Sequence, residues 1–567
     1  MSIKRTFPAI TVVVCLSFVV FSAYAQKARP NFDRPQTYDV QHYAIRVSFD
    51  QSKKAVKGDT TVTLRPLSSN FRQLELDAVD LVFTSVQIEG KDENLNFKAN
   101  RGKVIVSLDK VYGPQDTVSL RFRYSANPKK GVYFVDAPAR SESSTRSAQI
   151  WTQGEPEEAR HWFPAFDFPS DKATTEQQIT VEKGLTVIGN GELISKKENN
   201  DGTETWHYKM PVPHPTYLVS FIVGNYVEIK DSYKEIPLGF YVYPGRENTA
   251  RNAFGDTKRM FPVFEALTGV AYPFNKYDQT IVADFQFGGM ENITATTMAD
   301  SEIFFADSDI GKGPVMDLVS HELAHSWFGN NVTCKNWAEL WLNEGFATFM
   351  EAAYREKING RGDYLRKIRS DAAAFLVDDT YNRRRHALYN VRAGDVNSLF
   401  DNASTTYQKG GAVLHTLREQ VGDPNFWKAV NIYLNRHRFG SVETTDLRKA
   451  MEEASGQQLG WFFDQWVYGA GSPKITVRPI YNARTGTLSL AISQTQLNDT
   501  ITPYVFRLPL DIVVKTANGD QTEKLEITQR IQTFKFKVPG KPAEIEIDPG
   551  EKIPLKQVTM RSITSVR

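Results

Sequence analysis

The sequence predicts a multidomain α+β protein with an N-terminal antiparallel β domain, a mainly α-helical central domain and a C-terminal β-sandwich. Apolar and polar residues alternate in the first part of the chain, helical patterns dominate from Met316 onward, and the alternation returns after Pro473. The chain has 567 residues, of which 41% are hydrophobic. That length is enough for about three or four domains with buried cores.

Residues 1–25 have the pattern of a signal peptide. Two basic residues precede the apolar run Ala9–Phe21, and Ala23-Tyr24-Ala25 has the small-x-small form of a signal peptidase site. The apolar run is shorter than the roughly 20 residues that span a membrane. We therefore expect cleavage after residue 25, a secreted or periplasmic location and no stable membrane insertion. An uncleaved membrane anchor is the alternative.

Residues 26–227 are predicted to form the N-terminal β domain. Apolar residues alternate with polar ones in several runs, and clusters of Gly, Pro and Asn separate these runs. A period of two is typical of strands in antiparallel sheets. The clearest runs are Ile45, Val47 and Phe49, and Val118, Leu120, Phe122 and Tyr124.

Residues 228–472 are predicted to form the helical central domain. Asp423 and Pro424 predict a helix start, with Asp423 as the N-cap and Pro424 at the first helical position. Residues 444–455 have a helix-forming composition, and the Gly- and Pro-containing segment 469–473 ends the helical pattern.

Residues 473–567 are predicted to form a small β-sandwich, because strand-like alternation returns in this segment. Leu488, Leu490 and Ile492 make up one such run. Phe534, Phe536 and Val538 make up a second.

The charge and the cysteine content narrow the classes of partner and chemistry. A formal net charge of +2 gives no indication of nucleic acid or of an anionic membrane as a partner.

Removal of residues 1–25 leaves Cys334 as the one cysteine, so no internal disulfide is expected and the core must hold the fold. We expect Cys334 to be a packed thiol. A nucleophilic role is the alternative, but no base lies near it in sequence.

His321-Glu322-Leu323-Ala324-His325 has the pattern H-E-x-x-H. On a helix, positions i and i+4 lie on one face, so both imidazoles can reach one zinc ion. From residue frequencies alone, H-E-x-x-H is expected by chance in roughly one in a hundred sequences with nine histidines. A pair of hydrogen-bonded core histidines is therefore the alternative.

Glu344 is the candidate for a third ligand. It lies 19 residues after His325, on a helix predicted to begin near Ala338. A catalytic zinc requires three protein ligands and one open position, so the prediction is one zinc per chain. Glu339 and Glu351 are competing carboxylates, and otherwise they are expected to be surface charges.

Glu322 is predicted to be a general base rather than a ligand. It follows His321 directly and is therefore turned about 100° around the helix. Zinc lowers the pKa of water at the metal to about 7. The glutamate can take a proton from this water and pass it to the departing amine.

These residues resemble the gluzincin peptidases, in which H-E-x-x-H is followed by 18 residues and Glu. Gly288-Gly289-Met290-Glu291-Asn292 resembles the G-x-M-E-N motif of the M1 family of zinc aminopeptidases. Similar family segments occur in order from about Tyr38 to Pro473. They are Thr152–Glu155, Arg160, Phe163-Pro164, Asp167–Pro169, Lys172–Thr174, Tyr407–Gly411 and Trp461–Gly469.

The resemblance implies a thermolysin-like catalytic domain at residues 228–472 and peptides with a free N-terminus as substrates. It further implies that Glu291, helped by Glu155, binds the substrate's α-ammonium, and that Tyr407 donates a hydrogen bond to the tetrahedral oxyanion. Carboxylates suit an ammonium group, and an oxyanion requires a fixed donor. The other substrate-binding positions that it implies are Gln153, Gly288, Gly289, Met290 and Asn292.

Two departures from the family pattern matter. The family motif is usually G-A-M-E-N, whereas this sequence has Gly289 in place of the alanine. Some family members that have glycine at this position also act on lipid epoxides. The sequence also has the short form that lacks a C-terminal helical domain, so we expect an open cleft. A thermolysin-like zinc endopeptidase and a non-enzymatic peptide-binding protein on the same fold are the alternatives.

Overall fold

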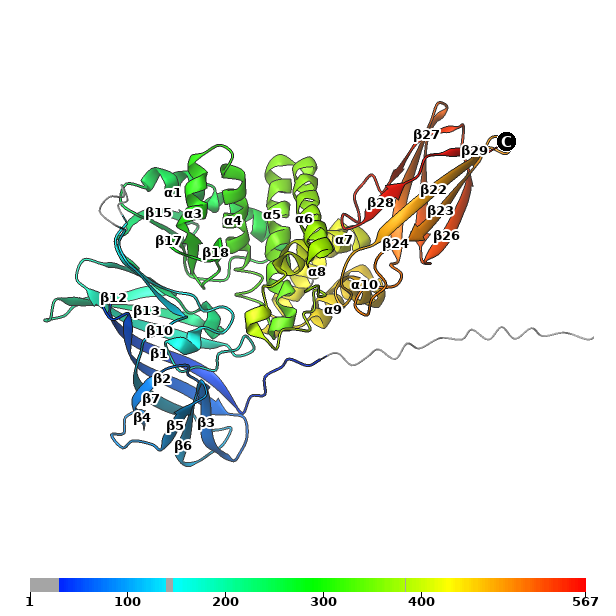
Figure 1. Cartoon of the computed structure of the whole chain (residues 1–567). Helices are drawn as coiled ribbons and strands as arrows, with labels where there is room; N and C mark the ends of the chain where they lie inside the picture. Colours follow the sequence, from blue (N-terminus) through cyan, green and yellow to red (C-terminus); the bar gives the residue numbers. More distant parts are fainter. Residues whose placement is uncertain (1–29, 139–145, 383, 567) are drawn as a thin grey trace, which may run out of the picture. The chain divides into compact units, whose positions relative to one another are not determined.

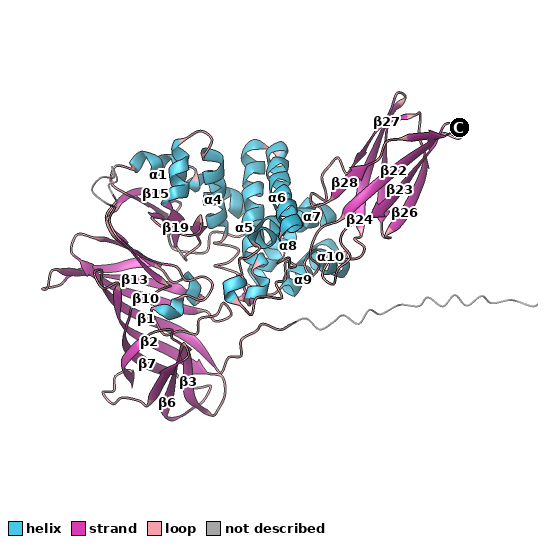
Figure 2. Cartoon of the chain, viewed as in Figure 1, coloured by secondary structure: helices cyan, strands magenta, loops and turns pink. Residues whose placement is uncertain are grey.

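The structure is a computed structural model that describes residues 30–138, 146–382 and 384–566. The predicted signal peptide lies outside the described residues. Figure 1 shows the chain coloured along its sequence, and Figure 2 shows strands at both ends of the described chain with most helices between them. The prediction of a β-rich N-terminal region, a helical central region and C-terminal strands is confirmed.

The N-terminal region contains three sheets. The largest has the order β12 (Glu192–Glu198), β13 (Thr203–His214), β10 (Ala173–Glu182), β1 (Tyr38–Asp50), β2 (Ala55–Pro66), β7 (Val118–Ala126) and β4 (Val82–Ile88). The second has the order β11 (Thr186–Gly189), β14 (Phe221–Gly224), β9 (Gln149–Thr152) and β8 (Val132–Val135). The third has the order β3 (Phe71–Asp77), β6 (Lys103–Tyr112) and β5 (Phe97–Asn100).

The expectation of purely antiparallel sheets in this region is wrong at one pair of strands. β1 and β10 run parallel, with His42 opposite Thr174. Parallel neighbours need a crossover of a dozen or more residues, and more than 100 residues separate these two strands in the chain. Side-chain alternation gives no information on the direction of a distant neighbour, so the sequence pattern could not reveal this pair.

Among the described residues, the central region combines a five-stranded mixed sheet and a two-stranded sheet with ten α-helices. The sheet order is β15 (Val227–Tyr233), β16 (Ile236–Val242), β17 (Tyr277–Val282), β19 (Ala295–Ala299) and β18 (Gly289–Met290). The helices are α1 (Glu247–Phe254), α2 (Thr257–Thr268), α3 (Asp300–Ile303), α4 (Lys312–Ala324), α5 (Trp341–Asn359), α6 (Arg361–Tyr381), α7 (Gly410–Val421), α8 (Asp423–Arg436), α9 (Thr444–Ser455) and α10 (Gly460–Trp466). Two short strands, β20 (Thr333–Cys334) and β21 (Ser441–Val442), pair in parallel between these helices.

The start of α8 differs from the prediction by one position. Gly422, with φ of 84°, is the N-cap, and Asp423 is the first helical residue. The Asp423 carboxylate does not cap the helix, because it accepts hydrogen bonds from Arg418 Nε at 2.6 Å and from Trp427 Nε1 at 3.2 Å. The predicted helix at 444–455 is confirmed as α9.

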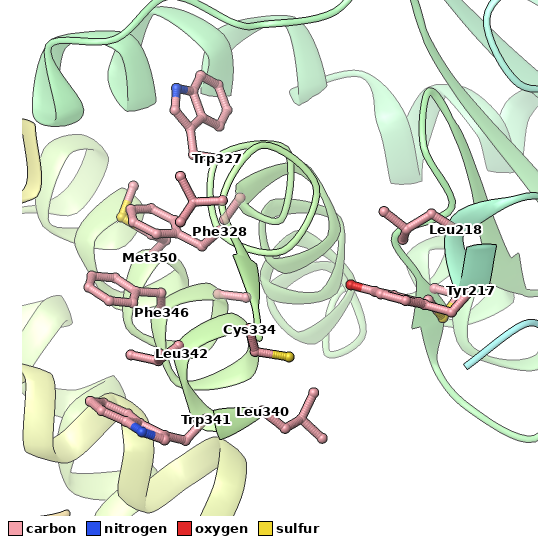
Figure 3. Close-up of a cluster of buried hydrophobic side chains, with 14 of the residues drawn as sticks. Tyr217, Leu218, Trp327, Phe328, Cys334, Leu340, Trp341, Leu342, Phe346 and Met350 are labelled. Atoms are coloured by element: carbon pink, nitrogen blue, oxygen red, sulfur yellow. The ribbon is translucent and has the colours of Figure 1, made fainter. Parts of the chain in front are cut away.

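An aromatic core fixes α4 and α5 against each other. The Phe328 and Phe346 rings stack with centroids 4.2 Å apart, and Figure 3 shows them within a cluster that also contains Trp327, Trp341 and Met350. Cys334 is buried in this cluster as a free thiol, which confirms the expectation of a packed residue.

The same cluster orients the start of α5. The backbone N–H of Cys334 donates to Asn343 Oδ1 at 3.0 Å, and Asn343 Nδ2 donates to the Tyr217 hydroxyl at 3.3 Å. Figure 3 shows this hydroxyl pointing toward the cluster. Since Asn343 directly precedes Glu344, these bonds hold the backbone that carries the predicted third ligand.

The C-terminal strands form two sheets. One has the order β26 (Ile531–Lys537), β23 (Thr487–Gln494), β22 (Lys474–Asn482) and β28 (Gln557–Met560), and β29 (Thr564–Val566) also pairs with β22. The other has the order β25 (Gly519–Ile527), β24 (Leu508–Thr516) and β27 (Pro542–Ile547). Among the described residues, no helix combines the length and the apolar character that crossing a bilayer requires.

Candidate active site

Three predicted metal ligands converge between α4 and α5. His321 lies in the last turn of α4, His325 directly follows that helix, and Glu344 lies in the first turn of α5. One ligand atom from each residue lies within 4.8 Å of the other two. Glu344 Oε2 is 3.2 Å from His321 Nε2 and 3.4 Å from His325 Nε2. The spacing of the motif therefore brings two imidazoles and one carboxylate to a single point.

The second nitrogen of each imidazole is already engaged. His321 Nδ1 is 2.7 Å from Glu351 Oε1, and His325 Nδ1 is 2.9 Å from the backbone oxygen of Phe328. Because these acceptors fix the proton on Nδ1, both Nε2 lone pairs face the Glu344 carboxylate. Two imidazole lone pairs and a carboxylate directed at one point would suit a cation between them. This donor set fits zinc, which binds imidazole nitrogen and carboxylate oxygen.

Glu351 and Glu339 do not lie on the surface as expected. Both are buried: Glu351 Oε2 contacts Lys367 Nζ at 2.7 Å, and Glu339 accepts a hydrogen bond from Thr444 Oγ1 at 2.6 Å. Glu351 lies seven residues after Glu344, which is about two helical turns on the same face. That spacing is the sequence signal that could have revealed it as the partner of His321.

Replacing Glu351 with glutamine should weaken zinc binding by about 10–100-fold, because this carboxylate orients His321 and raises its basicity. Competition with a chelator measures the affinity, and circular dichroism checks that the fold is retained. Glu339→Gln is the matched control, since it changes a buried glutamate that contacts no predicted ligand. Equal zinc affinity in Glu351→Gln and wild type would remove Glu351 from this role.

The predicted base, Glu322, lies beside the ligands with a free oxygen. Its Oε2 is buried without a hydrogen-bond partner, and burial raises the pKa of Glu322 to about 8. A Cβ atom at Gly289 would lie 2.2 Å from Glu322 Oε1, so an alanine at this position would displace the carboxylate. The glycine that departs from the usual family motif thus makes room for Glu322.

Glu155 and Glu291 lie next to the predicted ligands in the same cavity. Each can place one carboxylate oxygen within 4.8 Å of the other and of Glu344. The Oε1 atoms of both are buried and have no hydrogen-bond partner, and burial raises the pKa of both groups. Buried acids without donors are costly unless a positive charge joins them. This pair is suited to receive an ammonium group.

The remaining predicted binding residues fall into three groups. Gly288, Gly289 and Met290 line the same cavity as the ligands, next to Glu291. Gln153 contacts Met290 through Nε2 and Sδ at 3.2 Å but lines a neighbouring cavity. Asn292 is fully buried and is not among the residues that line either cavity. Its Nδ2 donates to Thr297 Oγ1 at 3.0 Å, which braces the turn that carries Glu291.

Tyr407 lies in a π-helical turn, Thr405–Lys409, that immediately precedes α7. Its ring is parallel to that of His321 within 14°, with centroids 5.9 Å apart. Burial raises the pKa of Tyr407 well above its usual value, so the hydroxyl stays protonated and can donate. Single π-helical turns of this kind often occur at functional sites.

A cavity of about 620 Å³ joins these groups. Its volume is within the range of peptide and small-molecule sites. The ligands, Glu322, Glu155, Glu291 and Tyr407 all line it. Besides Glu351, the structure adds seven lining residues that the motifs did not indicate: Phe287, Pro314, Asp317, Leu318, Lys367, Phe400 and Ala403.

Comparison with known proteins gives two family matches. Residues 252–466 match the peptidase family M1 domain, and residues 39–218 match the peptidase M1 N-terminal domain. Every predicted site residue lies within these two ranges.

Several relatives are named as aminopeptidases. Probable aminopeptidase 1 of Saccharolobus solfataricus is 30% identical over 457 residues, which cover 80% of this chain and 56% of the relative. Leucyl aminopeptidase of the same organism is 28% identical over 444 residues, or 77% of this chain and 54% of the relative. Glutamyl aminopeptidase of Bos taurus is 33% identical over 339 residues, which cover 58% of this chain and 35% of the relative. The chain thus spans about half the length of the first of these relatives.

Proposed function

Because the chain belongs to peptidase family M1, we propose that it is a zinc aminopeptidase that hydrolyses the N-terminal peptide bond of peptides. The observation that carries this proposal is the pair of buried carboxylates, Glu155 and Glu291, each with one oxygen that has no hydrogen-bond partner, beside the converging histidines. A thermolysin-like catalytic domain and secretion through residues 1–25 belong to the same proposal.

The chain's own residues divide the reaction between them. His321, His325 and Glu344 would hold one zinc ion, which supplies Lewis acidity and makes water nucleophilic near neutral pH. Glu155 and Glu291 bind the substrate's ammonium group by charge-assisted hydrogen bonds. The charge of a bound zinc ion would lower the raised pKa of Glu322, so that its free Oε2 can take the proton of the attacking water and deliver it to the departing amine.

Two further groups position the reacting peptide bond. Gly288 and Gly289 allow the substrate backbone to approach, since neither carries a side chain. The Tyr407 hydroxyl donates a hydrogen bond to the oxyanion that forms at the attacked carbonyl. The ring of this tyrosine lies parallel to that of His321, next to the predicted ligands.

The zinc endopeptidase alternative has less support. An endopeptidase must accommodate peptide on both sides of the cleaved bond, whereas two buried acids of the cavity lining, Glu155 and Glu291, disfavour the uncharged backbone of an internal peptide segment. The non-enzymatic alternative is expected to lack a ligand or the base, and all three ligands and Glu322 lie together here.

Fluorogenic aminoacyl amides test the proposed function. We expect the full chain to release the fluorophore. This hydrolysis should stop when a chelator removes the metal and resume when one equivalent of zinc is returned. Hydrolysis that continues at full rate in the apo-protein would contradict the metal assignment. No hydrolysis of any aminoacyl amide by the zinc-loaded chain would contradict the aminopeptidase assignment.

Tyr407→Phe should lower kcat by about 10²–10³-fold, because one oxyanion donor is lost. The zinc content and the thermal unfolding temperature should remain those of wild type. Tyr354→Phe is the matched control, since it changes a buried tyrosine on α5 that does not line the cavity. A rate for Tyr407→Phe within twofold of wild type would exclude the hydroxyl from the reaction.

A further inference from the structure

A second cavity of about 500 Å³ adjoins the one that holds the metal ligands. Glu155, Phe287 and Phe400 line both cavities, so the two meet at the carboxylate that is proposed to hold the substrate ammonium. Gln153 lines the second cavity and contacts Met290 of the first through Nε2 and Sδ at 3.2 Å. A substrate residue anchored on Glu155 and Glu291 therefore has its Cα atom at the junction of the two spaces.

An unbroken row of aromatic rings runs along this second cavity. Neighbouring ring centroids in the row are 4.4, 5.3, 6.0 and 5.7 Å apart. The rings come from β8, from β9, from the loop between β17 and β18, and from the segment that precedes the π-helical turn. In order they are Tyr133, Trp151, Phe285, Phe287 and Phe400.

The polar atoms of these rings are satisfied inside the protein. Trp151 Nε1 donates to the backbone oxygen of Ala283 at 3.2 Å, and the Tyr133 hydroxyl donates to Glu158 Oε2 at 3.0 Å. Ring carbon surface is therefore what the aromatic row offers to a ligand. Aromatic rings pair favourably with one another in offset or edge-to-face geometry.

The described lining residues include one lysine and one arginine, and each of them is paired with acidic side chains. Lys130 Nζ contacts Glu158 Oε1 at 3.1 Å, and Arg160 contacts Glu157 and Asp167. An acidic ligand group would thus find no free cation here and would lie near the Glu155 carboxylate. The Oε1 atom of Gln153, buried and without a partner, adds a further acceptor.

We propose that this aromatic cavity receives the side chain of the substrate's N-terminal residue and selects Phe, Tyr and Trp. The inference rests on the proposed aminopeptidase function and deepens it by naming the substrate class. A small side chain leaves the row exposed to water, and an acidic one meets acceptors and a carboxylate. Burial of a large side chain is expected to raise kcat/KM at least about tenfold over alanine.

The test is kcat/KM of the zinc-loaded full chain on amides of Phe, Tyr, Leu, Ala, Glu and Arg. We expect the Phe and Tyr amides to exceed the Ala and Glu amides at least about tenfold. An Ala, Glu or Arg amide as the best substrate, or equal rates for all six, would overturn this inference while leaving the aminopeptidase activity in place. No turnover of any amide would overturn both.

Phe287→Ala tests the row itself. Phe287 is 38% exposed as a residue, so the change should not disturb folding. The ratio of Phe to Ala amide kcat/KM should fall by about two- to tenfold, the contribution of one aromatic contact. Phe305→Ala is the matched control, because this residue is 56% exposed and lines neither cavity. An unchanged ratio in Phe287→Ala, or an equal fall in the control, would overturn the inference.

Discussion

Replacing Glu322 with glutamine should leave zinc binding intact and lower kcat by about 10²–10⁴-fold, the usual contribution of a general base. Glutamine has the shape of glutamate, so the close approach of this side chain to Gly289 is preserved. Its amide cannot take a proton from water. The zinc content per chain and kcat on an aminoacyl amide, measured on the same preparation, separate the two effects.

Glu322→Asp provides the control for this prediction. It keeps the carboxylate but withdraws it by one methylene, so activity should lie between that of Glu322→Gln and wild type. A kcat for Glu322→Gln close to that of wild type, with full zinc content, would show that another group takes the proton.

Replacing Glu344 with alanine should remove both zinc and turnover. The carboxylate is the shared neighbour of both Nε2 atoms, at 3.2 and 3.4 Å, and its loss leaves two ligands where a catalytic zinc needs three. Because only two of three ligands remain, we expect less than about one-tenth of the wild-type zinc content after dialysis and no measurable hydrolysis.

Glu453→Ala is the control for Glu344→Ala, because Glu453 lies on α9, where its carboxylate pairs with Arg436 Nη2 at 2.8 Å. Its zinc content and activity should match those of wild type. Stoichiometric zinc in dialysed Glu344→Ala would mean that Glu344 is not a ligand, and the neighbouring acids Glu155 and Glu291 would then be the candidates.

Local sequence patterns predicted the features that depend on residues close together in the sequence. The helix at 444–455 follows from composition, and H-E-x-x-H places two imidazoles together because a helix repeats every 3.6 residues. The packed state of Cys334 was expected because no base lies near it in sequence, and the thiol is buried and free. The parallel pair β1 and β10 could not be predicted, because strand direction depends on a distant partner.

The parts of the site that the sequence did not reveal depend on tertiary contacts. Glu351 has an ordinary helical position, and only the contacts to His321 and Lys367 show its role. Asn292 follows Glu291 directly in the motif, yet its side chain turns to Thr297. The aromatic row joins Tyr133 and Trp151 to Phe400, which is more than 200 residues away in the chain.

The most direct test of the central claim compares one peptide of about ten residues with a free and with an acetylated N-terminus, with products identified by mass spectrometry. Acetylation removes the charge that Glu155 and Glu291 are proposed to bind. We predict stepwise loss of residues from the N-terminus of the free peptide and no cleavage of the acetylated one. Cleavage of the acetylated peptide at an internal bond, at a rate comparable to that of the free peptide, would contradict the account.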